Sequence, residues 1–396
     1  MTGAQPEDFP FRLLPEDFGT PARLYTGCPV RQIRLPSGDV ASFVLDYDEV
    51  ETVLKDRRFS RNFRYEGAPR MVLSEDMSLN PNAIVNLDPP EHTRLRRSIQ
   101  WAFRPANAGS WRPKVQRVTD DLLDDVIAAG PPADLVESFA KLLPIRVMCE
   151  LVDVPDADRK QLIAWTGVFF STDAVAAGER DEASYSFFNY ARELVAARRA
   201  EPRDGLLDAL IKACDVDEIL SPAELHQMVL ALFIGGQENT SAILARGIFR
   251  LLRDGAYAAL CADPGLIEQA VEEILRYEVA SEGAFLRVTT EDVELGSGTI
   301  PRGTAVQVSL PAANRAGERF AHPDVFDIRR ARNPHLTFGA GAHFCPGAPL
   351  ARLELRIALG AVAERMPGLR LAIDPADVQY SQGSLVRALL GLPVSW

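Results

Sequence analysis

The segment from residue 335 to residue 347 reads His-Leu-Thr-Phe-Gly-Ala-Gly-Ala-His-Phe-Cys-Pro-Gly, and a pattern typical of a helix follows directly. Its lone cysteine, Cys345, stands where the first amides of that helix would point at the sulfur and stabilise a thiolate. The glycines of the segment let a large flat group approach the backbone closely. Together these features predict a haem whose iron is bound by the thiolate of Cys345.

Other interpretations of the same residues fit less well. Gly339 and Gly341 begin a dinucleotide-binding pattern, Gly-x-Gly-x-x-Gly, but Phe344 stands where the third glycine is required. A zinc site needs three or four ligands at short spacings, whereas the remaining cysteines are scattered singly, at Cys28, Cys149, Cys214 and Cys261. A buried apolar thiol is the usual state of a single cysteine, and the surrounding motif decides against it.

The segment resembles the haem-binding signature of the cytochrome P450 family, Phe-x-x-Gly-x-x-x-Cys-x-Gly with a basic residue two positions before the cysteine. All specified positions are filled, by Phe338, Gly341, His343, Cys345 and Gly347. The resemblance extends from about Pro29 to Pro393 and implies a mainly α fold with a small β-rich lobe. It also implies haem b between a long central distal helix and a proximal cysteine loop, with Cys345 as the iron ligand and Phe338, Gly339 and Gly347 beside the cofactor.

The composition favours a soluble globular protein with a sizeable core. Of the 396 residues, 47% are hydrophobic and 25% are charged, which is ordinary for that class. We find no linker, no low-complexity run and no internal repeat, and therefore expect residues 1–396 to form a single unit.

The N-terminal residues, the number of cysteines and the net charge indicate the cellular compartment and the kinds of partner. Residues 1–18 are acidic and contain no apolar segment, so they predict neither a signal peptide nor an anchor. No window approaches the roughly 18 to 20 apolar residues of a membrane-spanning helix. Five cysteines without a framework spacing indicate a reducing compartment, and a formal net charge of −12 argues against nucleic acid as a partner. We expect a cytoplasmic protein.

The hydrophobic pattern predicts mostly helix with a few short strands. Residues 30–47 predict a hairpin around a turn at 36–39, followed by a helix over 48–55. From about residue 89 to 280, apolar residues recur at spacings of three and four, which indicates helices. Short strands are expected again around 285–309 and 368–394.

A long buried helix is predicted to begin at Ser221-Pro222-Ala223-Glu224, a capping box with proline at the first helical position. Residues 228–234 are apolar on every side, and Gly235 and Gly236 follow. Each glycine inside a helix costs roughly 1 kcal/mol relative to alanine, so the pair indicates that another group passes close by.

By resemblance this helix is the distal helix, with Gly235 and Gly236 at the small positions that leave room for dioxygen and Glu238 as the acid. Asn239 stands where the family usually has a threonine, whose hydroxyl relays protons better than an amide does. Thr240 lies one residue on, rotated by about 100° around the helix. Two hypotheses follow: water or a substrate hydroxyl completes the relay in a hydroxylase, or the reaction is one that needs no relay, such as oxidative coupling. The alternative to a catalytic role is that residues 238 and 239 only kink the helix.

Cations that hold the haem propionates are expected near a second helix start at Asp88-Pro89-Pro90-Glu91. By resemblance the propionate-binding residues are His92, Arg96, Arg287 and His343. Glu273 and Arg276 match a buried Glu-x-x-Arg pair of the family, joined by a second arginine, for which Arg330 is preferred and Arg329 is the alternative.

The chain shows no flavin or iron–sulfur signature, so the resemblance implies a ferredoxin and a ferredoxin reductase as electron donors. The arginines expected to attract the ferredoxin are Arg94, Arg97, Arg352 and Arg356. The segments expected to line the substrate pocket are 61–85, Phe169 with Phe170, 232–238, 281–285, and Leu385 with Val386. Glu282 is either a partner for a substrate amine or an exposed turn residue. The expected substrate is a small organic molecule, free or carrier-bound, in secondary metabolism. A peroxygenase and a non-catalytic haem sensor remain as alternatives.

Overall fold

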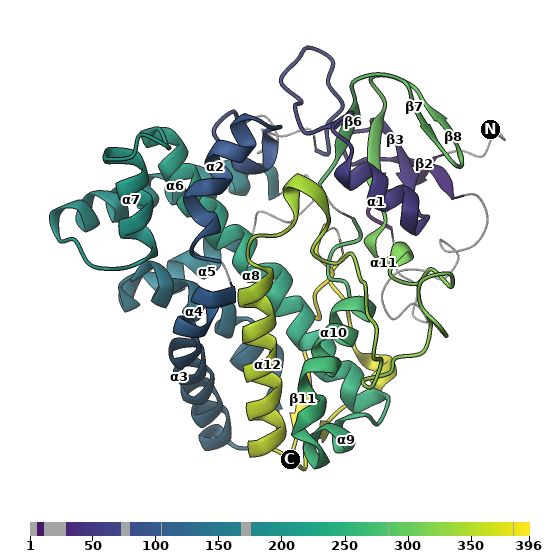
Figure 1. Ribbon diagram of the computed structural model, residues 1–396. Helices are drawn as coiled ribbons and strands as arrows, with labels where there is room; N and C mark the ends of the chain where they lie inside the picture. Colours follow the sequence, from purple (N-terminus) through teal and green to yellow (C-terminus); the bar gives the residue numbers. More distant parts are fainter. Residues whose placement is uncertain are drawn as a thin grey trace.

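A helix-rich body and a smaller sheet-rich lobe make up the described chain (Figure 1). The computed structural model describes residues 6–11, 29–72, 80–103, 105–167, 176–283, 285–382 and 384–396. The α-helices of this part are α1 (Tyr47–Lys55), α2 (Glu91–Gln100), α3 (Pro105–Ala129), α4 (Leu142–Val152), α5 (Arg159–Gly167), α6 (Ala176–Ala200), α7 (Leu206–Asp215), α8 (Pro222–Arg253), α9 (Tyr257–Ala262), α10 (Ile267–Tyr277), α11 (Leu310–Ala313) and α12 (Ala348–Arg365). The predicted helical stretch from 89 to 280 is confirmed.

The largest sheet joins the beginning of the chain to the segment near residue 300. Its strand order is β1 (Glu7–Asp8), β2 (Val30–Arg34), β3 (Val40–Val44), β9 (Ala305–Val308), β6 (Arg287–Thr289) and β4 (Phe59–Ser60). β2 and β3 form the predicted hairpin, and Gly38 takes a φ of +92° in its turn. β3 pairs in parallel with β9, so the lobe is closed by strands far apart in sequence.

Two smaller sheets complete the strands. β7 (Val293–Leu295) and β8 (Gly298–Ile300) form a hairpin, while β11 (Pro393–Ser395) lies between β10 (Arg370–Leu371) and β5 (Ala133–Asp134). These strands confirm the predictions for 285–309 and 368–394. Short helical turns occur at η3 (Ile84–Asn86), η4 (Val136–Ala140), η5 (Asp156–Asp158), η6 (Pro264–Leu266), η7 (Gly341–His343) and η8 (Pro375–Asp377).

α8 runs through the centre of the helical body and packs against α4, α6 and α12. Ser221 caps its first turn, and the reciprocal hydrogen bonds of Ser221 and Glu224 form the predicted capping box. The helix is assigned continuously from Pro222 to Arg253, across residues 238 and 239. α10 approaches it closely: a Cβ at Gly247 would lie 2.8 Å from Cγ2 of Ile274.

The apolar character of α8 exceeds what we expected from the sequence. By length and composition it would be sufficient to cross a membrane, although the sequence predicted no such window. In the folded protein 67% of that apolar window is buried among other elements. The hydropathy of α8 therefore serves contacts with the surrounding helices.

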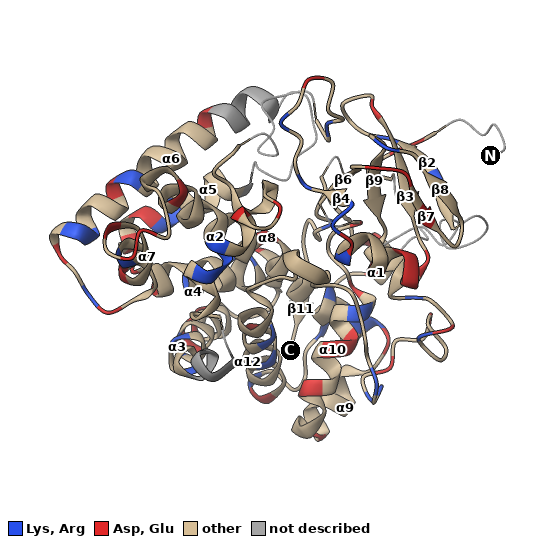
Figure 2. Ribbon diagram, turned by 45° about the horizontal axis from the view of Figure 1, so that its top comes forward, with Lys and Arg blue, Asp and Glu red and all other residues tan. Residues whose placement is uncertain are grey.

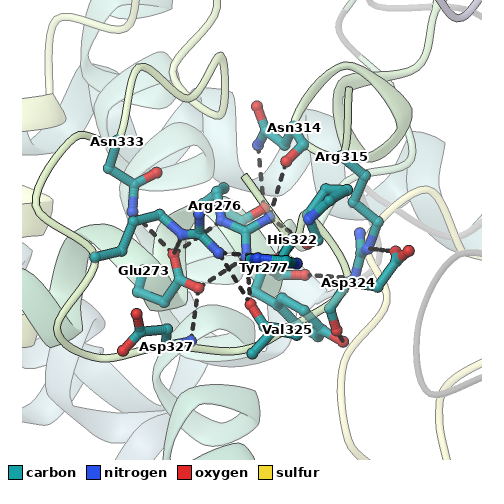
Figure 3. Close-up of polar contacts among 12 residues, drawn as sticks. Glu273, Arg276, Tyr277, Asn314, Arg315, His322, Asp324, Val325, Asp327 and Asn333 are labelled. Carbon is teal, nitrogen blue, oxygen red and sulfur yellow. Dashed lines mark hydrogen bonds and ion pairs between the residues drawn. The ribbon is translucent and has the colours of Figure 1, made fainter. Parts of the chain in front are cut away.

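A buried polar cluster ties α10 to the irregular segment between residues 314 and 333 (Figure 3). The Glu273 carboxylate accepts two hydrogen bonds of 2.8 Å from Arg276 and one of 3.0 Å from Arg330. Both Glu273 and Arg276 are fully buried. The prediction of Arg330 as the second arginine is confirmed, since Arg329 is exposed.

Candidate active site

Cys345 lies just before α12, and its sulfur faces the beginning of that helix. The backbone amides of Gly347 and Ala348 donate hydrogen bonds to the sulfur, which lowers the pKa of the thiol, as does the nearby charge of Arg96. Burial acts more strongly and raises the pKa above its ordinary value. A buried thiol of this kind gives up its proton when a metal cation takes the proton's place. The arrangement fits a sulfur ligand that becomes a thiolate on binding iron.

One of the glycines near Cys345, Gly341, is required by the packing of the protein backbone. Gly339 and Gly341 both have a φ of +70°, a conformation that favours glycine. A Cβ at Gly341 would lie 2.5 Å from the carbonyl oxygen of Leu54, so this glycine lets the turn pack on α1. A Cβ at Gly339 would lie 4.0 Å from the carbonyl oxygen of His343, and one at Gly347 would touch the sulfur at an ordinary 3.8 Å.

The four predicted propionate-binding residues come together from three separate elements. The rings of His92 and His343 lie 4.2 Å apart. Burial and the neighbouring charges of Arg96 and Arg287 lower the pKa of His92 to about 4. Burial, His92 and Arg287 lower the pKa of His343 to about 2. Burial also lowers the pKa of Arg287 to about 10. Both histidines are therefore neutral at neutral pH, and the positive charge of the cluster lies on Arg96 and Arg287.

Two nitrogens of this basic cluster are left without a partner in the described part of the chain. Nε2 of His343 and Nε of Arg287 are buried and have no hydrogen-bond partner among the described residues. A buried polar atom without a partner costs roughly 1 to 3 kcal/mol. A group that brings two carboxylates, as haem does, fits this set of donors. The cluster and the sulfur of Cys345 thus meet the requirements of a haem site.

The two adjacent glycines of α8 face different surroundings. A Cβ at Gly235 would have no atom within 4 Å, and this residue is exposed although it lies in the middle of a buried helix. A Cβ at Gly236 would lie 3.1 Å from Cγ of Met148 in α4. From the sequence, both glycines were expected to leave room for a group that passes close to the helix. In the structure, Gly235 opens onto free space while Gly236 permits close helix packing.

The polar residues after the glycines lie partly within the protein. Burial raises the pKa of Glu238, against the opposing charge of Lys141. Asn239 is half-buried, and its side chain makes no hydrogen bond to another described residue. Thr240 is 6% exposed, and the unbroken helix keeps it on a different face from Asn239. Thr240 is therefore more deeply buried than Asn239.

Gln237 has a partner that the sequence did not reveal. The Thr166 hydroxyl of α5 donates to Oε1 of Gln237, and both side chains are buried. The two residues are 71 positions apart, and no motif links them. This contact fixes α8 to α5 directly beside Glu238.

The expected substrate-pocket segments are described in part. Phe169, Phe170 and residues 73–79 lie outside the described residues. Phe285 is 56% exposed, and the guanidinium carbon of Arg61 lies 5.0 Å from the centre of its ring. The loop residue Ser281 forms a β-bridge with Val386, which places these two pocket segments side by side.

Glu282 is not the exposed turn residue that the sequence allowed as one of its two roles. Its side chain is buried, and Oε2 pairs with Nη2 of Arg387 at 2.9 Å. An exposed turn residue is thus wrong, and the carboxylate is already engaged by a cation of the protein itself. The partner lies 105 residues further on, which is why the local sequence pattern could not reveal it.

The arginines expected to attract an electron donor lie on α2 and α12 (Figure 2). Three of them form ion pairs within the protein: Arg94 with Glu224 at 2.6 Å, Arg352 with Glu272 at 2.7 Å, and Arg356 with Glu268 at 3.1 Å. Arg97 is exposed and has no acidic partner among the described residues. It lines an open surface pocket of about 530 Å³ together with Arg57, Pro89, Pro90, Thr93 and Arg94.

One further ionisable residue escaped the sequence reasoning. Glu354 in α12 is 2% exposed, its Oε2 has no hydrogen-bond partner among the described residues, and burial raises its pKa to about 8. The sequence could have indicated that Glu354 is buried, because Leu350, Ala358 and Val362 make the same helix face apolar at spacings of four. Glu354 interrupts that face.

Comparison with known proteins agrees with this geometry. The cytochrome P450 family model matches residues 264–366. The chain is 39% identical to the mycinamicin IV hydroxylase/epoxidase of Micromonospora griseorubida, with 100% of each chain covered. It is 40% identical to the nocardicin C N-oxygenase of Nocardia uniformis subsp. tsuyamanensis, over 93% of this chain and 92% of that enzyme.

A solved structure shows the same fold. The putative thioether synthase SgvP, involved in the tailoring step of griseoviridin, superposes with a TM-score of 0.93 at 36% identity, over 99% of this chain and 100% of that one. The expected P450 fold, the class of oxidoreductase and haem b as the cofactor are thereby confirmed. The chain belongs to the cytochrome P450 family of haem-thiolate monooxygenases.

Proposed function

We propose that Cys345 binds the haem iron and that His92, Arg96, Arg287 and His343 bind the propionates. Two features that lie next to each other support this proposal. The sulfur of Cys345 receives two amide hydrogen bonds, and the adjacent basic cluster contains buried nitrogens that have no partner among the described residues. Gly235 opens onto the space where the distal face of the cofactor would lie. Phe338, Gly339 and Gly347 shape the turn that holds the sulfur.

The bound cofactor supplies activation of dioxygen: one oxygen atom enters the substrate, the other leaves as water, and NAD(P)H is the ultimate source of the two electrons. The protein's own residues position the substrate and exclude water from the site. Glu238 holds a proton near Gly235 up to a higher pH than an exposed carboxyl would, because burial disfavours its charged form. Asn239 orients water or a substrate hydroxyl, since its amide both donates and accepts hydrogen bonds.

The substrate we propose is a small organic secondary metabolite, free or carrier-bound, and the most favoured reaction is hydroxylation. Support comes from relatives that are named for a hydroxylase/epoxidase and an N-oxygenase of such compounds. Oxidative bond formation is a second candidate, because Asn239 replaces the proton-relaying threonine and because a putative thioether synthase shares the fold.

We propose a cytoplasmic enzyme that receives electrons from a ferredoxin and its reductase. Of the four arginines considered for docking, Arg97 remains available, and Arg57 lies with it at the same surface pocket. An acidic donor would find unpaired cations there, although the whole chain is acidic. Charge reversal at Arg97 is expected to slow reduction by ferredoxin and to weaken its dependence on salt.

The purified holoprotein, reduced under carbon monoxide, tests the ligand assignment. We expect the long-wavelength absorption of a thiolate-ligated haem, and we expect Cys345→Ala to abolish it. Turnover with ferredoxin, reductase and NAD(P)H should exceed turnover with hydrogen peroxide. Equal turnover with peroxide would indicate a peroxygenase, and failure of both with intact haem would indicate a sensor.

A further inference from the structure

Arg352 in α12 lies between a carboxylate and an aromatic ring next to the cysteine loop. Its Nε and Nη2 donate to the two oxygens of Glu272 at 2.7 Å and 2.9 Å. The guanidinium carbon lies 4.6 Å from the centre of the Phe338 ring. A guanidinium held at both its edge and its face has a fixed position. Arg352 is thus a partly exposed but fixed cation next to the cysteine turn.

Glu272 is the acid that fixes this arginine. Besides Arg352, its Oε2 lies 3.1 Å from Nε2 of His335, and Nη2 of Arg356 lies 3.9 Å from Oε1. Hydrogen bonds from His335 and Arg352 lower the pKa of Glu272 to about 2, although burial acts in the opposite direction. The Glu272 carboxylate is therefore ionised at neutral pH.

Phe338 connects the pair to Cys345. Its carbonyl oxygen accepts a hydrogen bond of 2.9 Å from the Cys345 amide, so the ring that Arg352 covers belongs to the same turn as the sulfur. Arg352 also belongs to the helix whose first amide, that of Ala348, donates to the sulfur. Among the surrounding charges, Arg352 is one that favours the thiolate of Cys345.

We propose that Glu272 and Arg352 are positioning residues that set the reduction potential of the site, acting through the field of Arg352 on the Cys345 sulfur. The inference rests on the proposed binding of haem iron by Cys345. Reduction would add one electron to the haem iron bound by the Cys345 thiolate. A nearby cation therefore favours the reduced state, and a nearby anion opposes it. Glu272 holds Arg352 in place and partly offsets its charge.

Two charge-removing substitutions give effects of opposite sign. Glu272→Gln keeps a hydrogen-bonding side chain but removes the anion, and we expect the midpoint potential of the ferric–ferrous couple to rise. Arg352→Gln removes the cation, and we expect the potential to fall. We expect each change to be about tenfold in the equilibrium constant for reduction, which for a one-electron couple is about 59 mV. The measurement is spectroelectrochemical titration of the purified holoprotein.

Two further variants keep the test decisive. Arg365→Gln removes a cation from the far end of the same helix, where Arg365 pairs with Asp124, and should leave the potential unchanged. Arg352→Lys keeps the positive charge and should restore most of the potential, even where it loosens the contact with Phe338. Shifts of the same sign in Glu272→Gln and Arg352→Gln, or no shift in either, would overturn the proposal. A parent protein without thiolate absorption would instead refute the proposed ligand, and the two failures are distinguishable.

Discussion

Arg330 donates its Nε hydrogen to Oε2 of Glu273 across 3.0 Å, although 57 residues separate the two in the chain. Glu273 is fully buried in α10, and Arg330 belongs to the irregular segment between residues 314 and 333. The same carboxylate binds Arg276 from its own helix. A charge that has been removed from water on every side is here stabilised by two cations, so the three residues act as a unit.

Arg276→Gln should prevent assembly of the holoprotein. The substitution removes one of the two cations that stabilise the buried Glu273 carboxylate and deprives the carbonyl oxygens of Asn314 and Pro323 of their donor. Breaking a buried ion pair typically costs about 3 to 5 kcal/mol. The measurement is the ratio of haem to protein after purification, which we expect to fall severalfold.

Arg329→Gln is the matched control for that experiment, because Arg329 is adjacent to Arg330 but exposed. It should keep the haem content of the parent protein. If the Arg276 variant also kept full haem content, the buried pair would have no role in holding the fold together.

Local patterns in the sequence predicted those elements of the fold that interactions between neighbouring residues determine. The hairpin at 30–47 and the capping box at Ser221 follow from residues within a few positions of one another, and both are present. The partners of Glu282 and Arg352 could not be predicted, since each lies about 80 to 105 positions away on another element. The same limit explains why the ion pairs of Arg352 and Arg356 with Glu272 and Glu268 were not foreseen.

The family pattern added the long-range information for one set of residues. His92, Arg287 and His343 come from distant positions and nevertheless meet in one cluster, as the resemblance implied. Neither pattern nor resemblance separated Gly235 from Gly236. Their different surroundings depend on Met148 of α4, whose position follows from the packing of whole helices.

Asn239→Thr should reduce the share of NAD(P)H that ends as hydrogen peroxide, if the enzyme is a hydroxylase. The hydroxyl would relay protons that the amide relays poorly. Asn239→Val is the matched control, since valine has the shape of threonine without its hydroxyl. The measurement is peroxide released per NAD(P)H consumed with a bound substrate. Equal values for the threonine and valine variants would contradict a relay at this position and favour oxidative coupling.

Glu354→Gln should change how stability depends on pH. The raised pKa of Glu354, about 8, means that the folded protein keeps a proton that the unfolded chain loses above about pH 4.5. In this window the folded state binds more protons, so the parent protein loses stability as the pH rises, by about 1.4 kcal/mol per unit. Glutamine does not titrate, and the variant should be more stable than the parent near pH 8 but similar near pH 5.

Thermal unfolding of the Glu354 variant and its parent at these two pH values measures the difference. Glu364→Gln, an exposed change on the same helix, is the control and should follow the parent at both. A stability difference between the Glu354 variant and the parent that stays constant with pH would show that Glu354 is ionised in the folded protein.

Gly235→Ala and Gly236→Ala should separate access to the distal face from helix packing. Both substitutions favour the helix by up to about 1 kcal/mol. The new methyl at residue 235 enters open space beside the proposed haem, whereas the one at residue 236 meets the flexible side chain of Met148 at 3.1 Å. We therefore expect Gly235→Ala to weaken imidazole binding about tenfold in a spectral titration and Gly236→Ala to leave it nearly unchanged. Weaker binding in the Gly236 variant than in the Gly235 variant would mean that the glycine facing the cofactor has been wrongly assigned.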